Sequence, residues 1–119
     1  MQRLSLALLA LPLVWGCVGN GRTNLDLYVE AQNVRLYGFA CDGAPPAELE
    51  ERWLRLRPWL ASRLGHETIA RSETNVASER ELLDLIRCPT AQEKRRSTAA
   101  YARLIIVLES RARRSGVRL

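Results

Sequence analysis

A regular apolar stripe near the middle of the chain constrains the fold more than any other feature of the sequence. Its members recur at spacings of four, three, four and four residues, and they are Leu49, Trp53, Leu56, Leu60 and Leu64. This period places all of them on one side of an α-helix. Because a short helix is marginal in water on its own, other elements must cover that side. The stripe therefore predicts a helix within a small packed domain.

Two capping boxes predict further helices in the second half of the chain. Ser78 and Glu81 form the first box, and Thr90 and Glu93 form the second. In each box a hydroxyl and a carboxylate satisfy backbone N–H groups at a helix start. We expect a short helix after the first box and a longer one after the second. The apolar run at 104–108 is expected to be the most buried part of the longer helix.

Two other segments are less regular. Residues 66–77 are polar and lack a sustained period, so we expect a loop there. Residues 25–40 fit a helical face through Leu25, Val29 and Leu36, but their first positions also alternate as in a strand. We favour a helix for this segment, with a strand as the alternative.

The whole pattern predicts an all-α fold, a small bundle of about four helices over residues 25–119. A chain of 119 residues has room for one domain. Its composition, 47% hydrophobic and 26% charged, excludes a largely disordered chain. No apolar run reaches the roughly 20 residues that a membrane-spanning helix needs.

The first residues are typical of an export signal. Arg3 supplies a positive charge, and residues 4–14 form an apolar stretch interrupted only by Ser5 and Pro12. This length suits the hydrophobic part of a signal peptide and is too short to cross a bilayer. We therefore expect residues 1–16 to be a signal peptide that is removed.

A cysteine follows this stretch in a distinctive context. The sequence Val14-Trp15-Gly16-Cys17 resembles the lipobox of bacterial lipoproteins. The resemblance implies that Cys17 carries acyl chains such as palmitate, and that residues 17–24 link this lipid anchor to the domain. Val18, in place of an Asp, implies the outer membrane, with the domain facing the periplasm. The alternatives are a secretory signal without lipidation and a cytosolic chain with a buried N-terminal helix.

The two remaining cysteines, Cys41 and Cys88, are an even pair in an exported chain, which predicts one disulfide. The alternative is two buried thiols. His66 is the only histidine and no C-x-x-C motif occurs, so we expect no metal site and no cofactor. The sequence also lacks the usual catalytic motifs, so we expect neither an enzyme nor a small-molecule substrate.

Trp59 and the basic C-terminal tail are the candidate partner-binding residues. Trp59 comes directly after Pro58 and lies off the apolar stripe. It could anchor a partner in a groove that a proline kink opens. The alternative is that it packs at the periphery of the core. The tail residues Arg111, Arg113 and Arg114 suit anionic lipid, peptidoglycan or an acidic partner, or else complement the helix dipole. The net charge is +5, but export makes nucleic acid an unexpected partner.

The domain also resembles the pilotins of type II secretion, lipoproteins that escort secretin subunits. The residues that carry this resemblance are Cys17, the segment Tyr37-x-Phe39-x-Cys41, Pro45-Pro46 and Cys88. The resemblance implies a groove between helices that receives a peptide of the partner. We therefore expect a binding or adapter module for another envelope protein. The alternatives are a periplasmic inhibitor or immunity protein and a structural lipoprotein of the cell envelope.

Overall fold

The computed structural model describes residues 21–41 and 44–119, and this part of the chain is helical with no strand. Its helices are α2 (Asn24–Gly38), α3 (Ala47–Leu64), α4 (His66–Ile86) and α5 (Ala91–Arg114). The prediction of a small all-α bundle is confirmed, and α2 settles the first segment as a helix. The expected signal peptide at 1–16 and the expected lipidation site at Cys17 lie outside the described residues.

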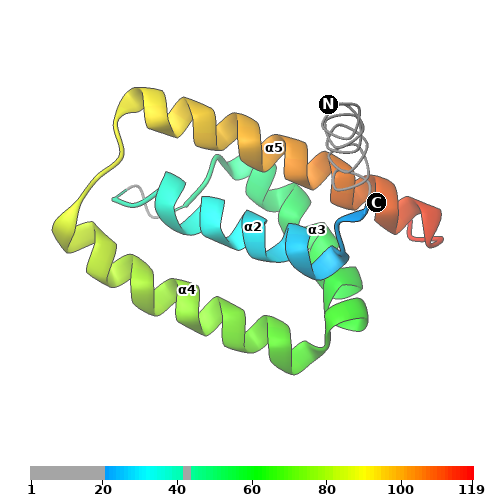
Figure 1. Cartoon of the computed structure of the whole chain (residues 1–119). Helices are drawn as coiled ribbons and strands as arrows, with labels where there is room; N and C mark the ends of the chain where they lie inside the picture. The colour runs from blue at the N-terminus through cyan, green and yellow to red at the C-terminus, as the bar shows by residue number, and fades with distance from the viewer. Residues whose placement is uncertain (1–20, 42–43) are drawn as a thin grey trace, which may run out of the picture.

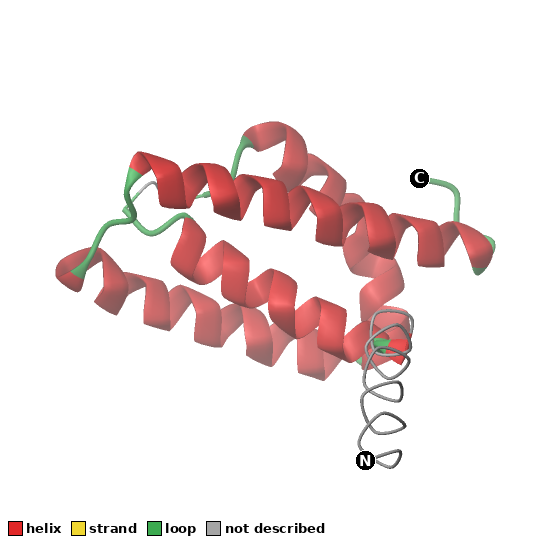
Figure 2. Ribbon diagram, turned by 45° about the horizontal axis from the view of Figure 1, so that its top comes forward, coloured by secondary structure: helices red, strands yellow, loops and turns green. Residues whose placement is uncertain are grey.

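Helix α2 lies at the centre of the arrangement. It contacts the other three helices, and α3 contacts both α4 and α5. Helices α4 and α5 lie on opposite sides of α2 (Figures 1 and 2) and do not contact each other within the described residues. The bundle is therefore open between α4 and α5, where α2 forms the floor.

The core forms where the stripe of α3 meets α2 and α5. Leu49, Trp53, Leu56 and Leu60 are buried, and Leu64 is partly buried, which confirms the stripe. The ring of Trp53 stacks on that of Tyr28, with 5.7 Å between centroids, and lies 5.9 Å from that of Tyr101. Aromatic contacts of this kind join three helices around one side chain.

The expected loop at 66–77 is wrong, because α4 runs without a break from His66 to Ile86. Ser78 lies inside this helix, so the first predicted capping box does not start one. The segment needs little apolar surface to be helical: Ile69 is the buried residue that fixes its first half. Ion pairs on its polar surface also stabilise this part of the helix. They include Arg71–Glu67 at 3.3 Å and Arg57–Glu73 at 2.7 Å.

Helix α5 starts where the second capping box predicts. The backbone N–H of Glu93 donates to Thr90 Oγ1 at 3.1 Å, and that of Thr90 donates to Glu93 Oε1 at 2.9 Å. The expectation for 104–108 is wrong in part. One side of this run is buried, but Ile106 and Val107 are 55% and 40% exposed. The reason is that only one face of α5 packs on the bundle.

A disulfide and a close helix contact fix the end of the bundle where α2 stops. The sulfurs of Cys41 and Cys88 lie 1.98 Å apart, so the predicted disulfide is confirmed and ties the end of α2 to the α4–α5 connection. Gly38 allows α2 and α5 to cross closely, because a Cβ atom there would overlap the side chain of Ser97. A larger residue at position 38 would push the two helices apart.

Candidate functional site

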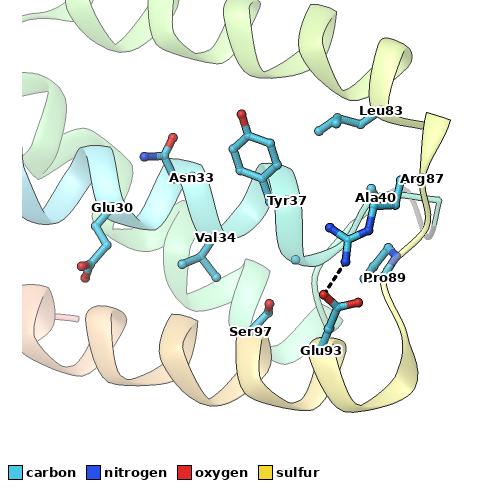
Figure 3. A pocket seen from close by; sticks show the side chains of 11 residues that line it. Glu30, Asn33, Val34, Tyr37, Ala40, Leu83, Arg87, Pro89, Glu93 and Ser97 are labelled. Atoms are coloured by element: carbon cyan, nitrogen blue, oxygen red, sulfur yellow. Dashed lines mark hydrogen bonds and ion pairs between the residues drawn. The ribbon is translucent and has the colours of Figure 1, made fainter. Parts of the chain in front are cut away.

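The open end of the bundle contains a hollow of about 340 Å³ between the last half of α2, the end of α4 and the start of α5. We call it the α2–α4–α5 hollow (Figure 3). Its lining is Glu30, Asn33, Val34, Tyr37, Gly38, Ala40, Leu83, Arg87, Pro89, Glu93 and Ser97. Most of the lining surface is apolar. A hollow of this size with a few polar groups at its edge suits the side chains of a ligand or partner.

The side chains divide the hollow into two sides. Figure 3 shows Tyr37 and Asn33 directed from α2 toward α4, and Val34 and Glu30 directed toward α5. Near the α4–α5 connection, Arg87 donates to Glu93 at 2.6 Å. The pKa of Glu93 is lowered by hydrogen bonding to the backbone N–H of Thr90, with a further contribution from Arg87. The ion pair Arg87–Glu93 therefore stays charged at the rim of the hollow, next to its apolar lining.

Apolar side chains are exposed in the lining of this hollow and elsewhere on α4. Tyr37 is 57% exposed, and Leu82 and Leu85 are 61% and 85% exposed. Leu83 lines the hollow itself. The C-terminal part of α4 thus presents more apolar surface than its packing on the bundle uses. Clustered exposed apolar residues on a small protein are typical of interaction sites.

A partly buried ion pair joins α2 to α3 near this hollow. Arg35 donates from Nε and Nη2 to the two carboxylate oxygens of Glu50, at 3.0 and 2.7 Å. Tyr101 donates its hydroxyl to Glu50 Oε1 at 2.6 Å, and the Arg35 guanidinium lies 5.3 Å from the centre of the Trp53 ring. These contacts join α2, α3 and α5. The paired groups are turned into the core, so we assign them a structural role.

The pKa shifts of these groups follow from burial and pairing. Burial alone would raise the pKa of Glu50, but hydrogen bonds from Arg35 and Tyr101 outweigh it and lower that pKa. Burial raises the pKa of Tyr101, and its bond to Glu50 adds to the rise, so the phenol stays protonated. Burial opposes the charge of Arg35, but Glu50 raises its pKa. The pair is therefore charged at neutral pH and held by a neutral phenol.

The structure does not place Trp59 on a surface. Its side chain is 7% exposed and belongs to the core cluster, which agrees with the alternative of core packing and leaves little surface for a partner. Its Nε1 donates to no acceptor among the described residues. Trp59 lies off the main stripe, yet its side chain is packed in the core. The hollow lies elsewhere, at the opposite end of α5 from the basic tail.

The three tail arginines have different surroundings. Arg111 is half-buried and donates to Asn24 Oδ1 at 3.0 Å, which links the end of α5 to the start of α2. Arg114 donates to Ser110 Oγ at 3.3 Å and is exposed, as is Arg113. Only the last two are available to a partner without breaking a contact between helices.

Sequence reasoning missed most of the hollow. Tyr37 belonged to the segment that resembles pilotins, but Val34, Leu83 and Pro89 were not singled out. The sequence offers a signal for α4 alone: positions 82, 83 and 85 are all leucine, so one packed face of a helix cannot cover all three. An excess of apolar residues over one face indicates an additional contact surface.

No known relative helps to interpret this site, because no family model, no curated protein and no solved structure matches the chain. Within the described residues, no group of three or more His, Cys, Asp or Glu side chains is placed to hold a metal ion. His66 is exposed at the start of α4. None of the described helices combines the length and hydropathy that crossing a bilayer requires.

Proposed function

We propose that this chain is a lipid-anchored envelope protein that binds another envelope protein in the α2–α4–α5 hollow. The observation that carries the proposal is the mostly apolar hollow, whose lining includes the exposed side chain of Tyr37. In this proposal the protein acts by holding a partner, without catalysing a reaction. The pilotin-like case, in which the partner is a secretin subunit, is one form of it.

The shape of the hollow favours an amphipathic helix of the partner as the occupant. Three helices form its walls and floor, and a helix can lay one apolar face into such a groove. Its apolar side chains would contact Val34, Tyr37 and Leu83. The rim pair Arg87–Glu93 offers one charge of each sign to polar groups of the same helix. Ordered apolar anchors surrounded by polar groups are the usual composition of a binding hot spot.

The anchoring part of the proposal rests on the sequence before α2. Cys17 in its lipobox-like context is the proposed lipid attachment site, after removal of residues 1–16. Several acyl chains together hold a protein on a membrane almost irreversibly. We place the domain on the periplasmic face of the outer membrane, because Val18 follows the cysteine.

Replacing Cys17 tests the anchor. Cys17→Ala should move the protein from the membrane fraction to the soluble fraction or leave an unprocessed precursor, because no thiol remains to accept the lipid. Fractionation and intact mass give the result. Unchanged fractionation, together with a mass that differs from the wild type only by the substitution itself, would show that Cys17 carries no lipid.

Replacing Tyr37 tests the hollow. Tyr37→Ala and the control Leu54→Ala remove apolar side chains of nearly equal exposure, 57% and 59%, from different surfaces. Each tagged variant is purified from membranes after chemical crosslinking, and its partners are quantified by mass spectrometry. We expect Tyr37→Ala to reduce the main partner roughly tenfold or more and Leu54→Ala to leave it unchanged. Equal retention by both variants, with normal folding, would refute binding in this hollow.

A further inference from the structure

The outward face of α5 has a composition that its packing does not explain. At 100° per residue, nine exposed residues fall within an arc of about 120° that points away from the core. They are Arg95, Arg96, Ala99, Arg103, Ile106, Val107, Ser110, Arg113 and Arg114. We call this set the α5 outer face. Five of the nine are arginine, and none is acidic.

The acidic residues of α5 do not neutralise this face. Glu109 is 8% exposed and accepts two hydrogen bonds from Arg52, at 3.0 and 2.6 Å. Glu93 lies in the first turn, where it caps the helix and pairs with Arg87. Within the described residues, no ion pair involves an arginine of the α5 outer face. Its positive charge is therefore available to an anionic partner.

Two apolar side chains in the middle of the face indicate what kind of partner fits. Ile106 and Val107 are 55% and 40% exposed, with Arg103 before them and Arg113 after them. A purely polyanionic surface such as nucleic acid gains little from exposed aliphatic groups. At a bilayer surface, arginines pair with phosphate head groups while aliphatic side chains enter the acyl boundary. The combination favours anionic lipid.

The charge of α4 is the opposite of that of α5. Helix α4 contains five acidic and two basic residues, whereas α5 contains two acidic and seven basic residues. The two helices lie on opposite sides of α2 (Figures 1 and 2). An anionic surface would therefore attract the α5 side and repel the α4 side, so that the protein would have a preferred orientation.

The proposed anchor site is compatible with this orientation. The end of α5 is held to the start of α2 by the bond from Arg111 to Asn24. Cys17 precedes Asn24 by seven positions. Even a fully extended chain of this length places the two residues at most roughly 25 Å apart. A lipid on Cys17 would keep this end of α5 close to the bilayer.

We infer that the α5 outer face is a docking surface for an anionic phospholipid bilayer, with the arginines at the phosphates and Ile106 and Val107 at the acyl boundary. The α4 edge, with exposed Leu82 and Leu85, then faces away from the membrane. This inference rests on the envelope location in the proposed function, but it does not depend on the hollow.

Vesicle co-sedimentation tests the inference without the lipid anchor. A chain that begins at Val18 keeps the whole core cluster, whose members all lie between residues 27 and 119, and the disulfide. The probes are phosphatidylcholine vesicles with and without phosphatidylglycerol. We expect binding only to the vesicles that contain phosphatidylglycerol, and no competition from free inorganic phosphate. Absence of binding, or displacement by free phosphate, would overturn the inference.

Two sets of variants separate a specific surface from net charge. The triple variant Arg96→Glu, Arg103→Glu, Arg113→Glu changes the α5 outer face. The matched triple variant changes three exposed arginines of α3 and α4, by Arg55→Glu, Arg63→Glu and Arg71→Glu. Both triples change the net charge equally. We expect the first to weaken vesicle binding roughly tenfold or more and the second to weaken it only about twofold. Equal losses would overturn the inference.

A third variant tests the apolar part of the face. Ile106→Ser, Val107→Ser leaves the charge unchanged and should still weaken vesicle binding severalfold, with an unchanged melting curve. If this variant binds vesicles normally, and the wild type binds heparin as tightly as vesicles, the face fits a polyanion and the lipid assignment is wrong. Binding in the hollow is measured separately through Tyr37, so either result can fail without the other.

Discussion

Two neighbouring glutamates should contribute very differently to stability, although both pair with arginine. Glu50 and Arg35 retain only 21% and 15% of their side-chain exposure. Glu51 and Arg55 retain 69% and 53%. The two N–O distances, 2.7 and 2.9 Å, are similar. Burial, rather than distance, should therefore decide the effect of replacing each glutamate by glutamine.

The magnitude follows from what each substitution leaves behind. Glu50→Gln leaves the Arg35 guanidinium largely desolvated without its carboxylate partner. Breaking a fully buried pair costs about 3–5 kcal/mol of unfolding free energy, and the residual exposure here places Glu50→Gln near the lower end, about 3 kcal/mol. Glu51→Gln removes an exposed pair, so we expect less than about 0.5 kcal/mol.

Urea unfolding of the chain that begins at Val18, followed by tryptophan fluorescence, measures both changes. With a slope of about 1.5 kcal/mol per molar, the midpoint should fall by about 2 M for Glu50→Gln and by less than about 0.5 M for Glu51→Gln. Trp53 lies against Arg35, so its emission reports on the site itself. Similar midpoints for the two variants would refute the argument that burial decides the contribution.

Three further predictions concern acid, the helix crossing and the disulfide. Hydrogen bonds from Arg52 and Arg57 lower the pKa of Glu109 and Glu73, respectively, below the unfolded value. These ionised carboxylates therefore stabilise the fold above about pH 5, and the stabilisation is lost on further acidification. A urea midpoint that stays constant from pH 7 to about pH 3 would contradict this. Gly38→Ala should lower the unfolding free energy by about 1–3 kcal/mol, because the added Cβ would meet Ser97. The control Gly21→Ala has open space around its Cβ and should change the unfolding free energy little. Equal melting temperatures for the two variants would contradict this prediction. Reduction of the disulfide should lower the unfolding free energy by about 4 kcal/mol. Hydrogen exchange should then increase first at the end of α4, next to Cys88. A uniform increase along the chain would show that the end of α4 does not depend on the disulfide.

The fold was predictable wherever one helical face buries many large residues. The stripe from Leu49 to Leu64 has the period of a helix and a core to face, so α3 and its burial followed from the sequence. The first half of α4 was not predictable in this way, because Ile69 is the buried residue that holds it to the bundle. Ion pairs and helix-forming residues supply the rest, and these leave no period in hydrophobicity.

The site was less predictable than the fold, because a hollow depends on the distance between elements. The sequence identifies the apolar residues of α2 and α4 but contains no direct measure of how far α4 and α5 diverge. Trp59 illustrates the limit: its position off the stripe left open a groove anchor or peripheral core packing, and its side chain is buried in the core cluster. Similarly, the run at 104–108 indicated burial, but only one face of α5 meets the bundle.

The central claim is that the α2–α4–α5 hollow binds another protein, and site-specific photo-crosslinking in native membranes tests it most directly. A photoreactive phenylalanine derivative replaces Tyr37 in one full-length chain and Leu54 in the other, since the two positions are nearly equal in exposure. The account predicts one dominant adduct from position 37, mapped by mass spectrometry to a single amphipathic helix of an envelope protein, and none of that adduct from position 54. No adduct from position 37, or the same set of adducts from both positions, would contradict it.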